Sequence, residues 1–265
     1  MGNPAQHKAR KRFGQNFLHD QGVISRIVRS IAPREGEHLV EIGPGQGAIT
    51  KELLRAGGAL DAVELDRDLI QPLTEMCADL GQLHLHSADA LKFDFCSLVE
   101  NEKPLRLVGN LPYNISTPII FHLLKQSHCI SDMHFMLQKE VVDRMAAEPG
   151  SKVYGRLTVM LQTLCSVESL FEIGPGAFKP APKVNSALVR LVPYEKPPYA
   201  ISDRAFFAQM VTAAFSQRRK TLRNSLRDLV DTETMTEAGI ESSIRAERLT
   251  LEEFVTLSNL ACKKH

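Results

Sequence analysis

The segment from His38 to Thr50 constrains the fold more than any other part of the sequence. His38–Ile42 reads as a buried strand, Gly43-Pro44-Gly45-Gln46-Gly47 follows at once, and a helical pattern begins at Ala48. Glycines permit a tight turn and let the backbone approach a ligand closely at the N-terminus of a helix. The sequence therefore predicts a strand–turn–helix unit that binds a nucleotide-like ligand.

The string Glu-Ile-Gly-Pro-Gly occurs a second time, at Glu172–Gly176. The residues that follow it, 177–182, contain two prolines, which remove backbone donors and favour extended backbone. A helix cannot begin there, so we expect Gly174 and Gly176 to form a turn and not a cofactor loop.

Strand and helix periodicities alternate through the first half of the chain, which predicts an open parallel sheet in an α/β fold. We expect a helix through residues 24–31 and further helices near 48–55, 68–80, 118–125 and 140–147, with Pro72 confined to the first turn or two of its helix. The expected strands are 38–42, 60–65, 83–87, 105–108 and 133–137. Two later strands, 166–173 and 187–192, have no long helix between them and should pair antiparallel at one edge.

A domain boundary is expected at Lys196-Pro197-Pro198, because the pattern beyond it is wholly helical. A chain of 265 residues is long for one hydrophobic core. We therefore expect a cofactor-binding catalytic domain over residues 1–196 and a small all-α domain over 197–265.

Basic residues are segregated along the chain. The net charge is only +1, yet eleven positive charges lie in three acid-free stretches, residues 1–14, 215–227 and 263–264, which leaves the rest of the chain at −10. Segregated basic patches are typical of proteins that bind a polyanion such as nucleic acid. The residues expected to contact nucleic-acid phosphates, from the N-terminal run and from an expected basic helix at 218–227, are Arg10, Lys11, Arg12, Arg218, Arg219, Lys220 and Arg223.

Two features of the sequence indicate the cellular compartment of the protein. It has no run of eighteen apolar residues and no apolar segment of a secretory signal at its basic N-terminus. Its five cysteines are odd in number, widely spaced and never in a CxxC pair. We expect a cytoplasmic protein with no membrane partner, whose thiols are reduced and mostly buried.

The glycine loop also matches the dinucleotide fingerprint, so an NAD enzyme is the first alternative. Glu64 ends the second strand 21 residues after Gly43, where it can hold a ribose in either cofactor. Glu41 before the loop, a third glycine at Gly47 and Asp89 after the third strand favour S-adenosylmethionine, because a pyrophosphate is disfavoured beside a carboxylate.

Asn110-Leu111-Pro112-Tyr113 follows the fourth strand, at the edge of the sheet where ligands of such folds bind. The exocyclic amine of adenine is a poor nucleophile because its lone pair is delocalised into the ring. If the side-chain oxygen of Asn110 and the carbonyl of Leu111 each accept one N–H, the lone pair can turn toward a methyl donor. Tyr113 would then stack on the base.

Six motifs in this order resemble the S-adenosylmethionine-dependent ribosomal RNA adenine N6-dimethyltransferases that act on the small subunit. They span nearly the whole chain: residues 13–18, 41–47, 62–66, 89–91, 109–118 and 178–186. The resemblance implies a Rossmann-like class I methyltransferase fold with a mostly parallel seven-stranded sheet, and dimethylation of two adjacent adenines in a hairpin near the 3′ end of the RNA.

The resemblance also implies a role for each matching residue. Asn16 and Leu18 would contact the methionine end of S-adenosylmethionine, and Gly43 and Gly45 would approach it through their backbone. Glu64 would hold the ribose, and Asp89 would contact the cofactor adenine. The target adenine would lie at Asn110, Leu111 and Tyr113 with Phe178 beside it, and the partner would be ribosomal RNA within a pre-assembled small subunit. A monomer is the simplest expectation for the oligomeric state.

Three other functions are compatible with parts of this sequence. A sister family that methylates large-subunit RNA and confers macrolide resistance shares the cofactor motifs, but residues 215–224 resemble the small-subunit enzymes. A non-catalytic RNA-binding relative is disfavoured by the intact motif at 110–113. His84 and His86 share one face of a strand, yet no further ligand stands at a metal-binding spacing, so no metal is expected.

Overall fold

The structure is a computed structural model that describes residues 16–264, and it divides into two compact units. The first contains the described residues up to Val142 together with Glu168–Pro193, and the second contains Asp143–Val167 and the chain from Tyr194 onward. The later division lies close to the expected boundary at 196/197. A single cut does not account for residues 143–167, whose Tyr154 and Val159 belong to the hydrophobic core of the second unit.

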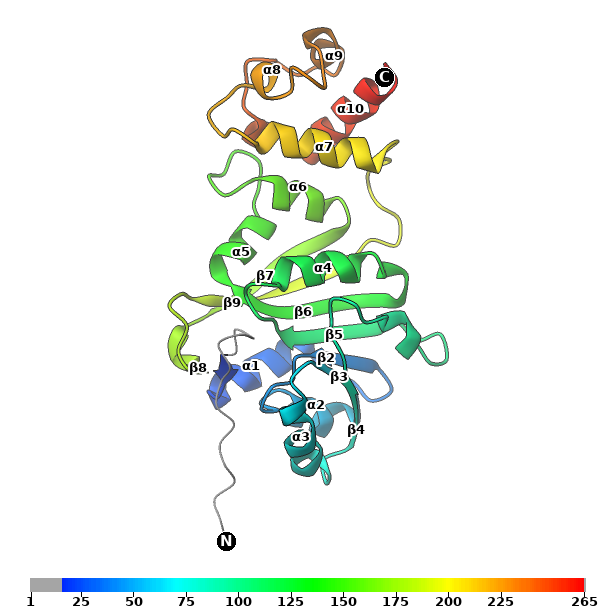
Figure 1. The fold of residues 1–265 in the computed structure, drawn as a ribbon, viewed down its shortest axis with the longest axis vertical. Helices are drawn as coiled ribbons and strands as arrows, with labels where there is room; N and C mark the ends of the chain where they lie inside the picture. Colours follow the sequence, from blue (N-terminus) through cyan, green and yellow to red (C-terminus); the bar gives the residue numbers. More distant parts are fainter. Residues whose placement is uncertain (1–15, 265) are drawn as a thin grey trace. The chain divides into compact units, whose positions relative to one another are not determined.

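The main sheet has seven strands in the order β4-β3-β2-β5-β6-β9-β7, as Figure 1 shows. Neighbours from β4 through β6 run parallel, and β9 is antiparallel to β6, which confirms the mostly parallel seven-stranded sheet. The strands are β2 (His38–Ile42), β3 (Ala59–Glu64), β4 (Gln82–Ser87), β5 (Leu105–Asn110), β6 (Ile130–Gln138), β7 (Cys165–Ile173) and β9 (Ser186–Pro193).

The chain reverses its direction of travel across the sheet at β2. It runs from β2 outward through β3 to β4, and then returns to β5 on the other side of β2. The carboxyl ends of β2 and β5 therefore lie side by side at a topological switch point, which is where open α/β sheets bind ligands.

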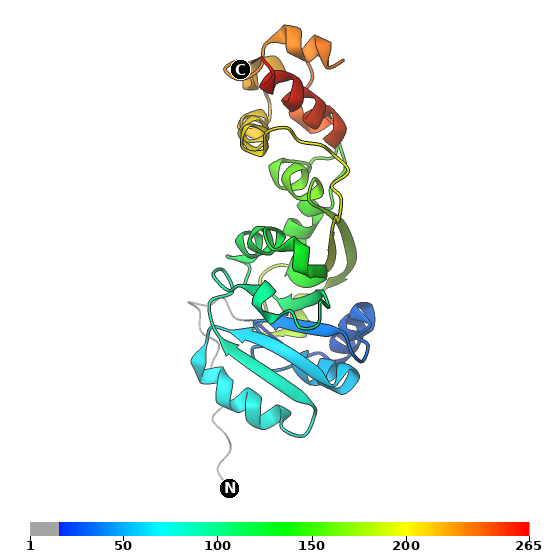
Figure 2. The same cartoon turned by 90° about the vertical axis from the view of Figure 1, so that its right-hand side faces the viewer.

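Helices lie on both sides of this sheet (Figure 2). They are α1 (Gln21–Ile31), α2 (Thr50–Gly57), α3 (Ile70–Cys77), α4 (Ser116–Leu124) and α5 (Lys139–Met145). Asp20 caps α1 by accepting the Val23 N–H, and Ile24, Ile27 and Ile31 form its buried stripe. Pro72 is the third residue of α3, within the first turn as expected, where its missing N–H leaves no helical bond unmade.

The second Glu-Ile-Gly-Pro-Gly copy forms a turn, as predicted. β7 ends at Ile173, a single 3-10 turn covers Pro175–Ala177, and β8 (Phe178–Lys179) follows at once. β8 pairs antiparallel with β1 (Phe17–Leu18), so this segment lies beside residues expected to contact the cofactor.

The second unit contains α6 (Arg156–Gln162), α7 (Arg204–Phe215), α8 (Leu222–Ser225), α9 (Thr232–Glu237) and α10 (Leu251–Cys262). The prediction of a basic helix over residues 218–227 is wrong. α7 ends at Phe215 because residues 216–221 are all polar and offer no apolar side chain to bury. The chain then turns, and the N–H groups of Leu222 and Arg223 bond to the carbonyls of Ile244 and Ser242. Within residues 16–264 no helix is long and apolar enough to cross a membrane.

The expectation that all five thiols are reduced is also corrected. Cys96 and Cys129 are joined by a disulfide, although they are 33 residues apart in the sequence. Cys77 and Cys165 are free and buried as expected, and Cys262 is free and partly exposed. A pairing of this kind depends on how the chain folds back on itself, which a spacing pattern does not record.

Candidate active site

A cavity of about 360 Å³ lies at the carboxyl ends of the parallel strands in the first unit. Seven of the predicted site residues line it: Asn16, Gly43, Glu64, Asp89, Asn110, Leu111 and Tyr113. A smaller cavity of about 30 Å³ shares Gly43 and Asn110 with it and is also lined by Leu18 and Glu41. The structure thus brings together residues that are spread over nearly a hundred positions of the sequence.

The first glycine loop has the backbone conformation that only glycine adopts without strain. Gly43, Gly45 and Gly47 have φ angles of 68°, 58° and 73°. The Gly43 N–H bonds to the Val63 carbonyl at 2.9 Å, which joins the loop to β3. A Cβ atom on Gly45 would lie 3.2 Å from the Phe17 ring, so the lack of a side chain at Gly45 also lets the loop backbone lie close to this ring.

Glu64 is buried at the end of β3 and is held by two backbone donors. Its carboxylate accepts the Gly45 N–H at 3.2 Å and the Asp66 N–H at 2.8 Å. Burial raises the pKa of this carboxyl, and the two backbone bonds oppose the rise. The oxygens retain lone pairs on the cavity that they line, as the predicted contact with a ribose requires.

Glu41 lines the smaller cavity and was not among the predicted site residues, although it comes just before the glycine loop. It is 2 % exposed, and its side chain accepts the Thr50 hydroxyl at 2.6 Å. Burial raises its pKa from 4.5 to about 7. A buried acid with so few partners next to a ligand cavity is typical of a functional site.

Asn110 has a fixed orientation in the larger cavity. Its side-chain NH₂ donates to the Asn16 carbonyl at 2.9 Å, across 94 positions of sequence. Because the nitrogen is committed to that carbonyl, the amide oxygen is the atom left to accept a hydrogen bond from a ligand. This is the arrangement that the proposed activation of an amine requires.

Tyr113 is anchored by a residue that the sequence argument did not single out. Its hydroxyl bonds to the Ser186 hydroxyl at 2.7 Å, and Ser186 is 1 % exposed at the start of β9. Burial raises the pKa of Tyr113, so the phenol stays neutral near pH 7. The only sequence signal for Ser186 was its position at the end of the motif 178–186.

Asp89 also lines this cavity, just after the end of β4. It is partly exposed, and its carboxylate accepts the Leu91 N–H at 3.0 Å. Ala88, Ala90 and Leu91 line the cavity beside it, so the acid stands at the edge of an apolar surface. An apolar wall with one acceptor fits the predicted contact with an adenine ring and its amine.

Some predicted residues lie elsewhere. Phe178 is 3 % exposed, is paired with Leu18, and packs in the core of the first unit; it is not among the described residues that line the two cavities. His86, considered above as a metal ligand, bonds instead to Asp61 at 2.6 Å, and His38 bonds to the other oxygen of Asp61 at 2.8 Å.

The predicted RNA-binding residues of the second unit are all exposed: Arg218, Arg219, Lys220 and Arg223. The Arg218 guanidinium donates to the Lys152 carbonyl, so it also holds a neighbouring loop. Arg10, Lys11 and Arg12 lie outside the described residues.

The sheet order with its antiparallel β9, the glycine loop after β2 and the acid ending β3 define a Rossmann-like class I methyltransferase, a class that takes methyl groups from S-adenosylmethionine. The chain belongs to the ribosomal RNA adenine dimethylase family, whose sequence model matches residues 6–263.

Individual relatives agree with this assignment. The chain is 59% identical over 253 residues to a "Ribosomal RNA small subunit methyltransferase A" of Hahella chejuensis, covering 96% of this chain and 93% of that protein. Among solved structures, a dimethyladenosine transferase from Plasmodium falciparum has a TM-score of 0.80 at 24% identity, covering 94% of this chain and 98% of that one, and supports the fold. The 23S rRNA methyltransferase ErmE has a TM-score of 0.74 at 25% identity, covering 93% and 100%.

Proposed function

We propose that this enzyme uses S-adenosylmethionine to dimethylate the N6 amines of two adjacent adenines in a hairpin near the 3′ end of small-subunit ribosomal RNA. The observation that carries the chemistry is the bond between the Asn110 side chain and the Asn16 carbonyl, because it leaves the amide oxygen as an acceptor in the cavity. Family membership and the 59% identical small-subunit relative support the choice of RNA.

The cavity residues fit the cofactor. The three left-handed glycines allow a close backbone approach, Glu64 offers carboxylate oxygens for the ribose, and Asp89 stands beside an apolar wall for the adenine. When bound, S-adenosylmethionine supplies an electrophilic methyl group on a positively charged sulfur. Asn16 and Leu18 line the cavities nearest the glycine loop, where the methionine end would lie.

The protein's contribution to the reaction is to position the amine. The Asn110 oxygen and the Leu111 carbonyl would each accept one N–H of the target, which turns the nitrogen lone pair away from the ring and toward the methyl group. Leu111 is followed by Pro112, which has no N–H to compete for that space. In-line methyl transfer needs little acid–base help, so orientation of this kind supplies most of the rate.

The target base must leave its stack to reach the cavity, at a cost of a few kcal/mol. The Tyr113 ring offers a stacking surface whose outer end is held by the bond to Ser186, and stacking on an aromatic ring contributes about 1–3 kcal/mol per base. A stacking role for Phe178 stays a prediction, since its ring is buried in this structure.

The large-subunit activity of the macrolide-resistance type is the alternative that shares most of this site. The identity to the 23S rRNA enzyme is 25%, against 59% to the small-subunit relative, which favours the small subunit. The fixed Asn110 side chain also argues against a relative that only binds RNA, because it presents an acceptor where an amine would react.

We also propose a partner and a compartment for the enzyme. We place the enzyme in the cytoplasm, where it acts as a monomer on RNA within a pre-assembled small ribosomal subunit. The exposed cations of the second unit, Arg218 to Arg223, and the N-terminal run at 10–12 would bind RNA phosphates.

The test is replacement of Asn110 by alanine. Loss of a preorganised acceptor should lower kcat by about 100- to 1,000-fold, while the affinity for S-adenosylmethionine changes little. Methylation is measured with labelled cofactor on unmethylated small subunits, followed by mapping of the modified nucleotides. The matched control is Tyr113→Phe, which keeps the ring and removes only the bond to Ser186; it should retain most activity.

Turnover by Asn110→Ala comparable to the wild type would refute the proposed role of this side chain. Label incorporated at large-subunit positions, and not in the small subunit, would refute the choice of substrate.

A further inference from the structure

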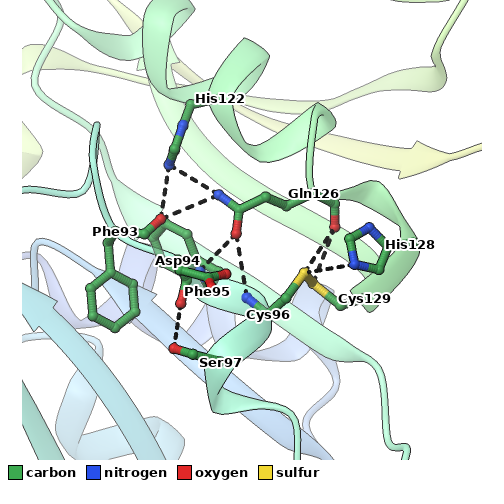
Figure 3. Close-up of a disulfide and its surroundings, with 9 residues drawn as sticks. All are labelled: Phe93, Asp94, Phe95, Cys96, Ser97, His122, Gln126, His128 and Cys129. Atoms are coloured by element: carbon green, nitrogen blue, oxygen red, sulfur yellow. Dashed lines mark hydrogen bonds between the residues drawn. A yellow bond between two sulfur atoms is a disulfide. The ribbon is translucent and has the colours of Figure 1, made fainter.

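Cys96 and Cys129 are joined by a disulfide (Figure 3). Neither cysteine lines the two cavities of the candidate active site. Cys96 belongs to the short 3-10 helix Phe95–Leu98, which begins four residues beyond the last cavity residue of that segment, Leu91. Cys129 ends the 3-10 turn Ser127–Cys129, which follows α4. The bond therefore joins two segments that each continue from a wall of the cofactor cavity.

A hydrogen-bonded frame holds these two segments together independently of the sulfur atoms (Figure 3). The Gln126 side-chain oxygen accepts the N–H groups of Phe95 and Cys96 at 2.7 and 3.3 Å, and its nitrogen donates to the Phe93 carbonyl at 3.2 Å. The His122 ring bonds to the same carbonyl at 2.9 Å. Reduction of the disulfide would leave this frame in place, so the two cysteines stay opposed with Cα atoms near the observed 5.6 Å.

The two sulfur atoms differ in access. Cys129 is 7 % exposed, whereas Cys96 is partly exposed and lies beside the exposed imidazole of His128, with 3.3 Å between its Sγ and the ring Nε2. An adjacent imidazole can take the thiol proton, which makes Cys96 the more reactive thiol. Cys77 and Cys165 are buried, and burial raises the pKa of both thiols, so they are poor nucleophiles.

We propose that Cys96 and Cys129 are a reversible oxidation site: a dithiol in a reducing environment, which closes to the observed disulfide when a low-molecular-weight disulfide accumulates. Cys96 is the attacking thiol, His128 is its proton acceptor and Cys129 is the resolving thiol. Disulfides in proteins of reducing compartments are mostly of this transient, redox-sensing kind.

The exchange balances in two steps. The Cys96 thiolate attacks one sulfur of oxidised glutathione, forms a mixed disulfide and releases one glutathione, which takes the proton held by His128. The Cys129 sulfur then attacks Cys96, which forms the intramolecular bond and releases a second glutathione together with the Cys129 proton. Two protein thiols are oxidised, and one glutathione disulfide is reduced to two thiols.

Metal binding is an alternative role for the same side chains. Among the described residues, Cys96, His128 and Cys129 are the group whose ligand atoms, all within 4.8 Å of one another, could hold an ion. Two thiolates and one imidazole would suit zinc. Zinc bound there would protect both thiols, so the two uses give opposite results in an oxidation experiment.

The full chain is reduced and then equilibrated in glutathione buffers of increasing oxidised fraction. The thiols that remain are alkylated in denaturant, so that the buried ones also react, and are counted by intact mass spectrometry. The wild type should fall from five alkylatable thiols to three in one step and lose the mass of two hydrogens. Closing a ring across 33 residues should also raise the melting temperature by about 5 °C or more.

Three variants make the test specific. Cys129→Ser should stop at the mixed disulfide and carry one glutathione on Cys96, and His128→Gln should close more slowly than the wild type. Cys262→Ser is the matched control, since that thiol is also partly exposed but has no sulfur partner, and it should still lose two thiols on oxidation.

Five thiols alkylated in denaturant after the folded wild type has been equilibrated at full oxidation would overturn the proposal, as would one equivalent of bound zinc that prevents closure. Glutathione on Cys262 with none on Cys96 in the Cys129→Ser variant would also overturn it. None of these readouts depends on methylation, so this inference and the proposed function fail separately.

Discussion

The two Glu-Ile-Gly-Pro-Gly copies allow the same substitution to be compared in two backbone conformations. Gly43 has a φ of 68°, which an L-residue adopts at a cost of about 1–2 kcal/mol, whereas Gly174 has a φ of −70° and open space around its Cα. We expect Gly43→Ala to lower the free energy of unfolding by about 1–2 kcal/mol and to weaken cofactor binding. Urea denaturation and calorimetric titration measure the two effects.

Gly174→Ala is the matched control. Alanine fits its backbone conformation and reduces the entropy of the unfolded chain, so the variant should be as stable as the wild type or slightly more stable. Equal destabilisation by both alanines would mean that backbone conformation is not what distinguishes the two copies.

Glu41 should make stability depend on pH near neutrality. Its pKa is raised from 4.5 to about 7 by burial, so folding favours its protonated form. The resulting stabilisation is complete below about pH 4.5 and is lost as the pH rises through 7, and its full size is on the order of 3 kcal/mol. Glu41→Gln cannot ionise and keeps an acceptor for Thr50.

The free energy of unfolding of Glu41→Gln, minus that of the wild type, should therefore increase by about 3 kcal/mol between pH 4.5 and pH 8. Urea unfolding at several pH values in that range measures it. The exposed Glu241→Gln serves as the control and should give a constant difference. A constant difference for Glu41→Gln as well would contradict the raised pKa.

Arg106 connects three elements at the amino-terminal edge of the sheet, away from the site. From β5 it donates two bonds to Asp132 on β6, at 3.0 and 3.1 Å, and further bonds to Glu37 at 2.6 Å and to the Ile31 carbonyl at the end of α1 at 2.7 Å. Arg106→Met leaves the carboxylate of Asp132, which is 10% exposed, without its main partner. Leaving a buried charge without its partner lowers the free energy of unfolding by about 3–5 kcal/mol, which chemical denaturation should detect.

Two further variants separate the stranded charge from lost packing. Arg106→Met combined with Asp132→Leu removes both charges and should recover most of the loss. Arg55→Met breaks the more exposed pair with Glu52 on α2 and should cost less than about 1 kcal/mol. If the double variant is no more stable than Arg106→Met, the unpaired charge of Asp132 is not the cause of the lost stability.

Strands and helices with strong periodicity could be predicted from the sequence to within a few residues. β2 has the predicted bounds, because its apolar run is ended by glycine, and α1 is marked by its buried isoleucines. The short α8 could not be predicted, since its start depends on backbone bonds from Leu222 and Arg223 to a distant segment. Local propensity carries no information about such bonds.

Some features of the candidate site could also be predicted from the sequence, and others could not. Glu64, Asp89 and Asn110 could be predicted because each follows or ends a parallel strand, and those ends meet at one edge of the sheet. The bond of Tyr113 to Ser186 spans 73 positions and joins a loop to an antiparallel strand, so no spacing rule gives it. Phe178 has a motif position, but its burial depends on the pairing of β8 with β1.

The uneven charge of the chain leads to a prediction about RNA affinity. The total is +1, yet the turn after α7 presents exposed Arg219 and Lys220 with no acidic residue within 218–227. Each phosphate contact releases counterions, so the logarithm of the affinity falls with the logarithm of the salt concentration in proportion to the number of contacts. Removing both cations should weaken binding of small-subunit RNA and reduce the steepness of that dependence by about 1.5.

The choice of Arg219→Ala with Lys220→Ala avoids Arg218, whose guanidinium holds the Lys152 carbonyl and whose loss would disturb the neighbouring loop. Arg34→Ala with Lys125→Ala, in the first unit, removes one exposed arginine and one exposed lysine as well and is the matched control. Because both double variants lower the net charge equally, a general attraction to RNA would flatten the salt dependence alike in both. Binding measured between about 50 and 200 mM salt should flatten only for the pair at 219 and 220 if phosphates contact that turn.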